Sequence, residues 1–292
     1  PIFMDCDDSL CMDPLKLEKF CSEECDFKEG VLVNKKTNKK IRALVIVHVF
    51  GNMADMEKIM DIAKKYNLRV LEDATEALGT YYTEGRYKGK YAGTIGDIGV
   101  LSFNANKIIT TGGGGMVVGD NEELVEKVRF LSSQAKKDTL YFIHDEIGYN
   151  YRMLNLQAAL GTSQIDQLES FIETKIKNYE IYKEELEKIE GLEILPFVER
   201  IRANHWFYSL KIDKKKYGIG RDELLQKLVD AGIQTRPIWG LIHQQKPYST
   251  CQSYEIEKAL YYYDRILNLP CSSNLTEKEV YQVIEKIKEF KK

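Results

Sequence analysis

Ala43-Leu44-Val45-Ile46-Val47 is a continuous apolar run rich in β-branched residues, which is typical of a parallel strand buried on both faces. We therefore expect this strand to be central in its sheet. Four apolar residues at helical spacing follow it and indicate an amphipathic helix: Met56, Ile59, Met60 and Ala63. Leu68-Arg69-Val70-Leu71 comes next as a second strand, and strand, helix and strand in about 30 residues make a βαβ unit. The stretch predicts an α/β fold with a mostly parallel sheet.

The same alternation extends to both sides of this unit. Upstream, Ile2-Phe3-Met4-Asp5 looks like a strand, and Asp13-Pro14 looks like the cap and first residue of a helix. Downstream, the pattern predicts two more strands and a helix, at 98–103, 116–118 and 121–133, with Asp120 as the helix cap.

The second half of the chain indicates a change of architecture. Residues 154–189 have a helical pattern with few breakers, long enough for a helix that joins two domains. Short strands and helices alternate after it. We predict a large domain over 1–190, including the connecting helix, and a small α+β domain over 191–292.

Composition excludes several classes of function. The 292 residues are 30% charged with a formal net charge of -3, which disfavours a general nucleic-acid surface. Neither an apolar run of about 20 residues nor a signal peptide is recognisable, so we expect a cytoplasmic protein. The six cysteines lack metal-ligand spacing and support neither a metal site nor a disulfide framework. The chain opens at Pro1 directly into an apolar run, and we expect that it begins mid-domain.

Two polar segments follow predicted strands, at the sheet edge where open α/β folds bind ligands. Asp73 ends the strand that begins at Leu68, where a carboxylate suits a cationic ring nitrogen; a helix cap or loop acid is the alternative. Lys107 follows the strand 98–103, and its amine suits a Schiff base with an aldehyde cofactor. The alternative is a surface lysine, which the apolar and glycine-rich neighbours of Lys107 disfavour.

The glycine run Gly112 to Gly115 has two interpretations, a phosphate cradle or a tight turn between strands. The turn is favoured. The run lacks both the lysine and serine that end a Walker motif and the spaced glycines of a dinucleotide site.

Several motifs together resemble the sugar-nucleotide aminotransferases of the DegT/StrS type, a branch of the fold type I pyridoxal-phosphate enzymes. They occur in the order typical of that family over nearly the whole chain: His48-Val49-Phe50-Gly51, Glu72 to Gly79, Gly96-Asp97, Ser102 to Lys107, Thr110 to Gly115, Gly148 to Met153, His205 to Tyr208 and Thr235-Arg236-Pro237.

This resemblance implies a role for individual residues of the cofactor site. Lys107 would be the Schiff-base lysine and Asp73 the partner of the pyridine nitrogen of pyridoxal 5'-phosphate. Ser102 would bind the phosphate, and Glu76 would lie near the ring hydroxyl, where a carboxylate repels a phenolate unless one of them is protonated. Asn150 would reach the phosphate of a neighbouring subunit, which implies a homodimer.

The resemblance also implies substrate contacts and an activity. Arg236, His205 and Tyr151 would lie in the substrate region, although a structural salt bridge for the arginine, and a core or interface position for the tyrosine, remain open. Lysine rather than histidine at position 107 is typical of the transaminases of this family rather than its sugar dehydratases. The closest subgroup aminates UDP-linked 4-keto-6-deoxy-N-acetylglucosamine, with glutamate as the expected amino donor, for surface glycan biosynthesis.

A rival hypothesis is that the chain is a catalytically silent fragment or pseudoenzyme of the same fold, with a binding or structural role. The resemblance implies roughly a quarter of a chain more at the N-terminus, including a helix start that binds the cofactor phosphate through its amides.

Overall fold

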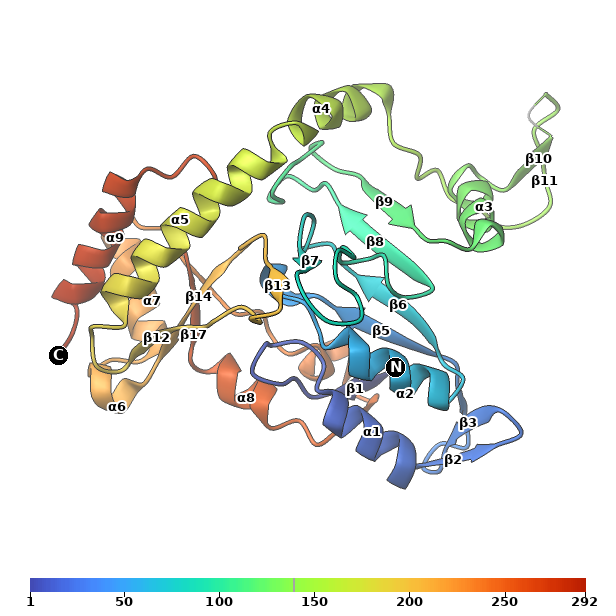
Figure 1. The fold of residues 1–292 in the computed structure, drawn as a ribbon, viewed down its shortest axis with the longest axis horizontal. Helices are drawn as coiled ribbons and strands as arrows, with labels where there is room; N and C mark the ends of the chain where they lie inside the picture. Colours follow the sequence, from blue (N-terminus) through green and yellow to red (C-terminus); the bar gives the residue numbers. More distant parts are fainter. Residues whose placement is uncertain (139) are drawn as a thin grey trace.

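The computed structural model describes residues 1–138 and 140–292 (Figure 1). Its central sheet has the order β5-β6-β8-β9. The first three strands are parallel, and the last is antiparallel to its neighbour: β5 (Ala43–Val47), β6 (Arg69–Asp73), β8 (Ile98–Ser102) and β9 (Gly115–Val118). Helix α2 (Met56–Lys65) joins β5 to β6. The predicted α/β fold with its βαβ unit is confirmed.

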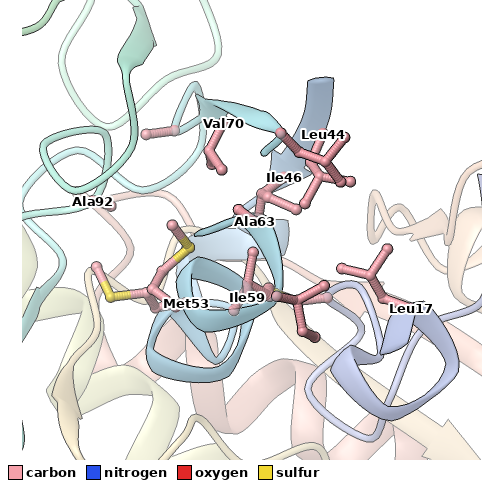
Figure 2. Close-up of a cluster of buried hydrophobic side chains, with 14 of the residues drawn as sticks. Leu17, Leu44, Ile46, Met53, Ile59, Ala63, Val70 and Ala92 are labelled. Carbon is pink, nitrogen blue, oxygen red and sulfur yellow. The ribbon is translucent and has the colours of Figure 1, made fainter. Parts of the chain in front are cut away.

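Strand β5 is less buried than its sequence predicts. Leu44 and Ile46 point toward α2, where they pack with Ile59 and Ala63 (Figure 2). Val45 points to the other face and is 54% exposed. In the described chain β5 pairs only with β6, so it lies at the edge of the sheet. The expectation of a central strand buried on both faces is wrong, because an apolar run shows what a strand can bury and not what covers it.

A buried carboxylate fixes the end of β6. Glu72 accepts hydrogen bonds from His48 Nε2 at 2.9 Å and from three backbone N–H groups, those of Gly93, Ile95 and Gly96, at 3.0, 2.6 and 2.5 Å. The Ala54 amide donates to His48 Nδ1, so Nε2 carries the proton that Glu72 accepts. Burial alone would raise the pKa of Glu72, but these hydrogen bonds outweigh burial and hold the pKa below its usual value.

The loop that supplies these amides lies directly against β8. A Cβ atom at Gly99 would come within 2.0 Å of the Gly93 carbonyl oxygen. Only glycine fits at that position of the strand.

The N-terminal segment packs beside the sheet and is tied to a distant part of the chain. Strand β1 (Ile2–Met4) pairs in parallel with β16 (Gln252–Tyr254). The buried Asp5 accepts hydrogen bonds from backbone N–H groups at the start of α8 (Lys258–Tyr263). It also forms an ion pair with Lys16. Helix α1 (Pro14–Glu23) begins at the predicted cap and proline, and a small antiparallel sheet follows: β2 (Cys25–Lys28), β3 (Val31–Asn34) and β4 (Lys40–Ile41).

The helical region after β9 differs from its prediction in two details. Asn121, and not Asp120, caps α3 (Glu122–Ser132), since its side chain accepts from the Leu124 amide. The single long helix expected over 154–189 is two helices, α4 (Asn155–Ile165) and α5 (Leu168–Leu186).

Several short elements connect these parts of the chain: β7 (Tyr81–Tyr82), β10 (Lys136–Asp138), β11 (Ile143–His144), β13 (Ile201–Arg202) and α6 (Lys214–Tyr217).

A second sheet has the order β12-β14-β17-β15. Its strands are β12 (Leu192–Ile194), β14 (Tyr208–Ile212), β17 (Ile266–Leu269) and β15 (Arg236–Pro237). Three helices share its core, α7 (Arg221–Asp230), α9 (Glu277–Glu289) and the second half of α5, which lies beside α9 in Figure 1.

The division of the chain near residue 190 stays a prediction, and backbone pairing crosses it at β1–β16 and at β7–β13. No helix in residues 1–138 and 140–292 combines the length and apolar character needed to cross a membrane.

Candidate active site

Lys107 lies in the loop after β8, half-buried, with its Nζ over the ring of Trp206 at 4.1 Å from the ring centroid. Trp206 is 3% exposed, and its indole Nε1 donates to the Asn106 carbonyl at 3.0 Å. The indole therefore binds the lysine loop twice, once through its N–H and once through its ring face. A residue 99 positions away in sequence thus holds the loop of Lys107.

Two carboxylates act on the Lys107 amine. Asp73 ends β6, and its Oδ1 accepts from the Thr75 amide at 3.2 Å. Burial lowers the pKa of Lys107, although the negative charges of Glu76 and Asp73 oppose this shift. A lowered pKa makes more of the uncharged amine available, which is the form that attacks a carbonyl. The two predicted catalytic residues, Lys107 and Asp73, therefore lie within electrostatic reach of each other.

Glu76 is 6% exposed and accepts a hydrogen bond from the Phe50 amide at 2.7 Å. Burial raises the pKa of Glu76 to about 7, with the Asp73 charge adding to the rise and the Phe50 amide and Lys107 opposing it. A carboxyl group with this pKa is largely protonated at slightly acid pH and can then donate a hydrogen bond.

The glycine run forms a turn between β8 and β9, as the sequence favours. Gly112 and Gly114 have positive φ, of 75° and 113°. The Thr111 amide donates to the Phe103 carbonyl and the Phe103 amide donates to the Gly114 carbonyl, which closes the loop of Lys107 at its base.

Ser102, the predicted phosphate ligand, lies at the end of β8, and its hydroxyl accepts from the Asn104 amide at 3.3 Å.

Helix α4 supports the same loop from outside. The Gln164 side chain accepts from the Thr110 amide at 3.0 Å and donates to the Thr110 carbonyl at 2.8 Å. Gln157 donates to the Gly113 carbonyl at 3.1 Å. Two glutamines on the same face of α4, about two turns apart, therefore fix the chain that follows Lys107.

Lys107 lines a cavity of about 750 Å³. Trp206, Phe207 and Arg236 line it together with Lys107, and its far side is formed by the second sheet and α9. This volume lies within the usual range of small-molecule sites. Arg236 thus lines the same cavity as Lys107, and its substrate role stays a prediction.

The other predicted site residues lie apart from this cavity. His205 is buried, with its ring 4.1 Å from Phe197 and 4.7 Å from Tyr179 between centroids. Burial lowers its pKa to about 4, and the charges of Lys175 and Arg202 add to this shift. Its position is that of a core residue, and its neighbour Trp206 lines the cavity instead.

Asn150 and Tyr151 are exposed and do not line the cavity. The Tyr151 ring stacks on that of Tyr149, with 5.1 Å between ring centroids.

The sequence did not reveal Trp206, Lys175 or Asn268 as cavity residues, because no local pattern marks contacts between segments so far apart. In the described chain no cluster of three or more histidine, cysteine or acidic side chains is placed to hold a metal ion.

Comparison with known proteins assigns the chain. The model of the DegT/DnrJ/EryC1/StrS aminotransferase family matches residues 1–288. The chain belongs to this family. Its relatives include EpsN of Bacillus subtilis (strain 168), 34% identical over 290 residues, which are 98% of this chain and 70% of EpsN. GDP-perosamine synthase of Escherichia coli O157:H7 is 36% identical over 259 residues, 88% of this chain and 68% of the relative.

Among solved structures, a DegT DnrJ EryC1 StrS aminotransferase from Brucella abortus matches with a TM-score of 0.87 and 25% identity, over 100% of this chain and 73% of the other. DegT/DnrJ/EryC1/StrS aminotransferases are pyridoxal-phosphate-dependent sugar aminotransferases, and the chain is an enzyme of this class.

The residues present fit this cofactor. A half-buried amine with a lowered pKa suits an aldehyde, and Asp73 provides a carboxylate at the neighbouring strand end. Because β6 and β8 are parallel, both groups lie at the same edge of the sheet.

Glu76→Gln and Glu72→Gln should change stability in opposite directions. The folded pKa of Glu76, about 7, lies above its unfolded value of about 4.3, so its stabilising effect is complete below the unfolded pKa and is lost as pH rises through 7. Glu76→Gln keeps the acceptor for Phe50 and removes the charge. It should therefore raise stability at pH 8, by on the order of 3 kcal/mol, and have much less effect at pH 5.

Glu72 is the matched control, since its pKa is lowered and its charge stabilises the fold above the unfolded pKa. Glu72→Gln leaves two N–H donors facing an amide N–H₂, which costs about 1–3 kcal/mol for each donor. Urea denaturation of the cofactor-free protein at both pH values measures these effects. Equal effects of Glu76→Gln at pH 5 and pH 8 would contradict the raised pKa of the buried Glu76.

Proposed function

We propose that the protein transfers an amino group from glutamate to the 4-keto group of a UDP-linked 4-keto-6-deoxy sugar, giving an amino sugar nucleotide for a surface glycan. The observation that carries the proposal is the Lys107 amine, which has a lowered pKa, two neighbouring carboxylates and an open cavity. The 4-keto-6-deoxy-N-acetylglucosamine subgroup is the proposed sugar class. One relative, GDP-perosamine synthase, is named for a GDP-linked sugar, so both the UDP-linked and the GDP-linked keto sugar are assayed.

Bound pyridoxal phosphate supplies an aldehyde that carries the amino group and a ring that withdraws the electrons of a breaking C–H bond. Lys107 would hold the cofactor through Nζ, and the same amine, when free, would move a proton between two carbons. Asp73 would pair through its carboxylate with the ring nitrogen and favour its protonated form. Glu76, when protonated, would avoid repulsion with the ring oxygen, and its raised pKa favours that state. Ser102 is the proposed phosphate ligand.

Arg236 is the proposed substrate residue inside the cavity. His205 and Tyr151 remain predictions from resemblance, and the position of neither side chain supports a direct contact within one chain. The rival hypothesis of a silent fragment or pseudoenzyme shares every structural feature above and differs only in turnover.

We also propose that the protein is a homodimer in which Asn150 reaches the cofactor phosphate of the partner. Asn150 lies in an exposed segment that is unusually apolar. Tyr149, Tyr151, Leu154 and Leu156 are 49%, 77%, 65% and 84% exposed. Contiguous exposed apolar surface commonly marks a site of protein–protein contact.

Turnover tests the proposed activity. The protein loaded with pyridoxal phosphate should aminate UDP-linked 4-keto-6-deoxy-N-acetylglucosamine with glutamate, while Lys107→Ala should lose both turnover and the visible absorbance of bound cofactor. Asp73→Asn should fold normally and slow the half-reaction with glutamate by roughly 100-fold or more, because it weakens the electron sink. Product formation is followed by mass spectrometry.

Amination of the GDP-linked sugar instead would correct the nucleotide and keep the reaction. Normal cofactor absorbance with no turnover on either sugar would favour the silent-protein hypothesis. Wild-type turnover by Lys107→Ala would remove the assignment of that lysine.

Subunit mixing tests the role of Asn150. If it serves the partner's site, hybrids of Lys107→Ala with an inactive Asn150→Ala contain one site with both changes and one with neither. Exchange between the two variants should then restore up to about a quarter of wild-type activity, as expected for random assortment across an isologous interface. The measurement requires that Asn150→Ala alone be severely impaired. Demonstrated exchange with no recovery would place Asn150 outside the partner's site.

A further inference from the structure

The indole of Trp206 offers an aromatic face to the Lys107 amine. Lys107 Nζ lies 4.1 Å from the centroid of this ring, within the distance at which an aromatic face attracts an ammonium. Tryptophan is the side chain whose ring attracts cations most strongly. Glu76 and Asp73 act on the same amine through their charges, without a hydrogen bond to it in the described chain. The ring face is therefore the contact that holds the amine.

Trp206 is held in place by contacts that do not involve this amine. Its backbone N–H donates to Asn204 Oδ1 at 2.9 Å, and its indole N–H donates to the Asn106 carbonyl at 3.0 Å. Phe207 stacks on the indole at 4.0 Å between centroids, with 15° between the ring planes. Asn204 is itself buried and donates to the Glu76 carbonyl at 2.9 Å. The aromatic face is therefore fixed independently of the lysine side chain.

The proposed reaction requires a place for the Lys107 amine when this amine does not hold the cofactor. The amine then takes a proton from one carbon, becomes an ammonium and delivers the proton to another carbon, and nothing is oxidised or reduced. The lysine stem is flexible, so an amine without a contact would leave the position from which it reaches both carbons. Burial also disfavours the ammonium form. A fixed ring face that attracts an ammonium meets both requirements.

We propose that Trp206 is a positioning residue that receives the Lys107 amine whenever this amine is released from the cofactor, and that its ring stabilises the ammonium. The reason for release rests on the proposed function, whereas the contact between amine and ring does not. Trp206 acts through Lys107 and through the loop that its indole N–H holds. It has no assigned contact with the substrate.

Other ionisable groups near this amine must be separated from it in any titration. Glu76 and Asp73 act on Lys107 through their charges, and Glu76 has a pKa of about 7. Arg236 and Lys175 line the same cavity, and burial lowers the pKa of Lys175. Lys107→Met therefore identifies which titration belongs to Lys107, and Glu76→Gln removes the titration expected near pH 7.

Two substitutions of Trp206 separate its ring face from its indole N–H. Trp206→Phe and Trp206→Leu both lose the hydrogen bond to the Asn106 carbonyl, but only Trp206→Phe keeps an aromatic face. In the cofactor-free protein, the pKa of Lys107 should be lower in Trp206→Leu than in Trp206→Phe by about half a unit, the size expected for a cation on a ring. Competitive acetylation over a series of pH values, with the Lys107 peptide quantified by mass spectrometry, measures this pKa.

Trp239→Phe is the matched control. Trp239 belongs to the same aromatic cluster, with its ring 6.1 Å from that of Trp206 between centroids, and it is 50% exposed. Its substitution should leave the pKa of Lys107 unchanged. In the cofactor-loaded protein, Trp206→Leu should slow a single turnover with glutamate by roughly tenfold, because the released amine is no longer held near both carbons, and Trp239→Phe should not.

A label that keeps the shape of the indole tests the contact even if Trp206→Leu does not fold. The chain has two tryptophans, so Trp239→Phe protein prepared with 5-fluorotryptophan carries the label at Trp206 alone. The fluorine resonance of the cofactor-free protein should shift as Lys107 titrates. Lys107→Met should remove this step, and Glu76→Gln should leave it in place.

An equal pKa of Lys107 in Trp206→Phe and Trp206→Leu would overturn the proposal, as would a fluorine titration that persists unchanged in Lys107→Met. The visible absorbance of bound cofactor, recorded on the wild-type protein, tests the proposed function separately. A wild-type protein that never binds the cofactor contradicts that function, and the comparison of pKa values in the cofactor-free protein still decides whether the ring stabilises the ammonium.

Discussion

The geometry of the site depends on the buried Glu72 carboxylate, which joins His48, the loop at residues 93–96 and the end of β6. Successive residues of a strand point to opposite faces, so an anchored Glu72 turns Asp73 to the other face of the sheet. The amides that bind Glu72 also bring their loop against Gly99 of β8. One carboxylate thereby positions the ends of the two strands that carry Asp73 and the Lys107 loop.

Burial then gives neighbouring ionisable groups different states. Glu72 has four donors and stays charged, while the equally buried Glu76 has one amide donor and a pKa raised to about 7. Lys107 has two carboxylates near it and still has a lowered pKa. Lys175 forms no ion pair with a carboxylate among the described residues, and its pKa is also lowered. The number of partners, rather than burial alone, separates anchoring groups from reactive ones.

The sequence predicts the parts of this structure that local patterns specify. The βαβ unit, the proline-led α1 and the glycine turn after Lys107 follow from spacing and backbone preference, and Asp73 and Lys107 were recognisable because each follows a strand. The break between α4 and α5 has no glycine or proline to mark it. Exposure of Val45 depends on what covers the sheet. Trp206, Lys175 and Asn268 reach the cavity from segments about 70 to 160 residues beyond Lys107, and only the folded chain places them there.

The central claim is that Lys107, of the two lysines lining the cavity, is the one that carries the cofactor. Borohydride reduction of the cofactor-loaded protein, followed by peptide mass mapping, tests it most directly because reduction fixes pyridoxal phosphate to the amine that holds it. The account predicts the added mass on the peptide that contains Lys107 and none on the peptide that contains Lys175. Label on Lys175, or a fully loaded protein with no label on Lys107, would contradict it.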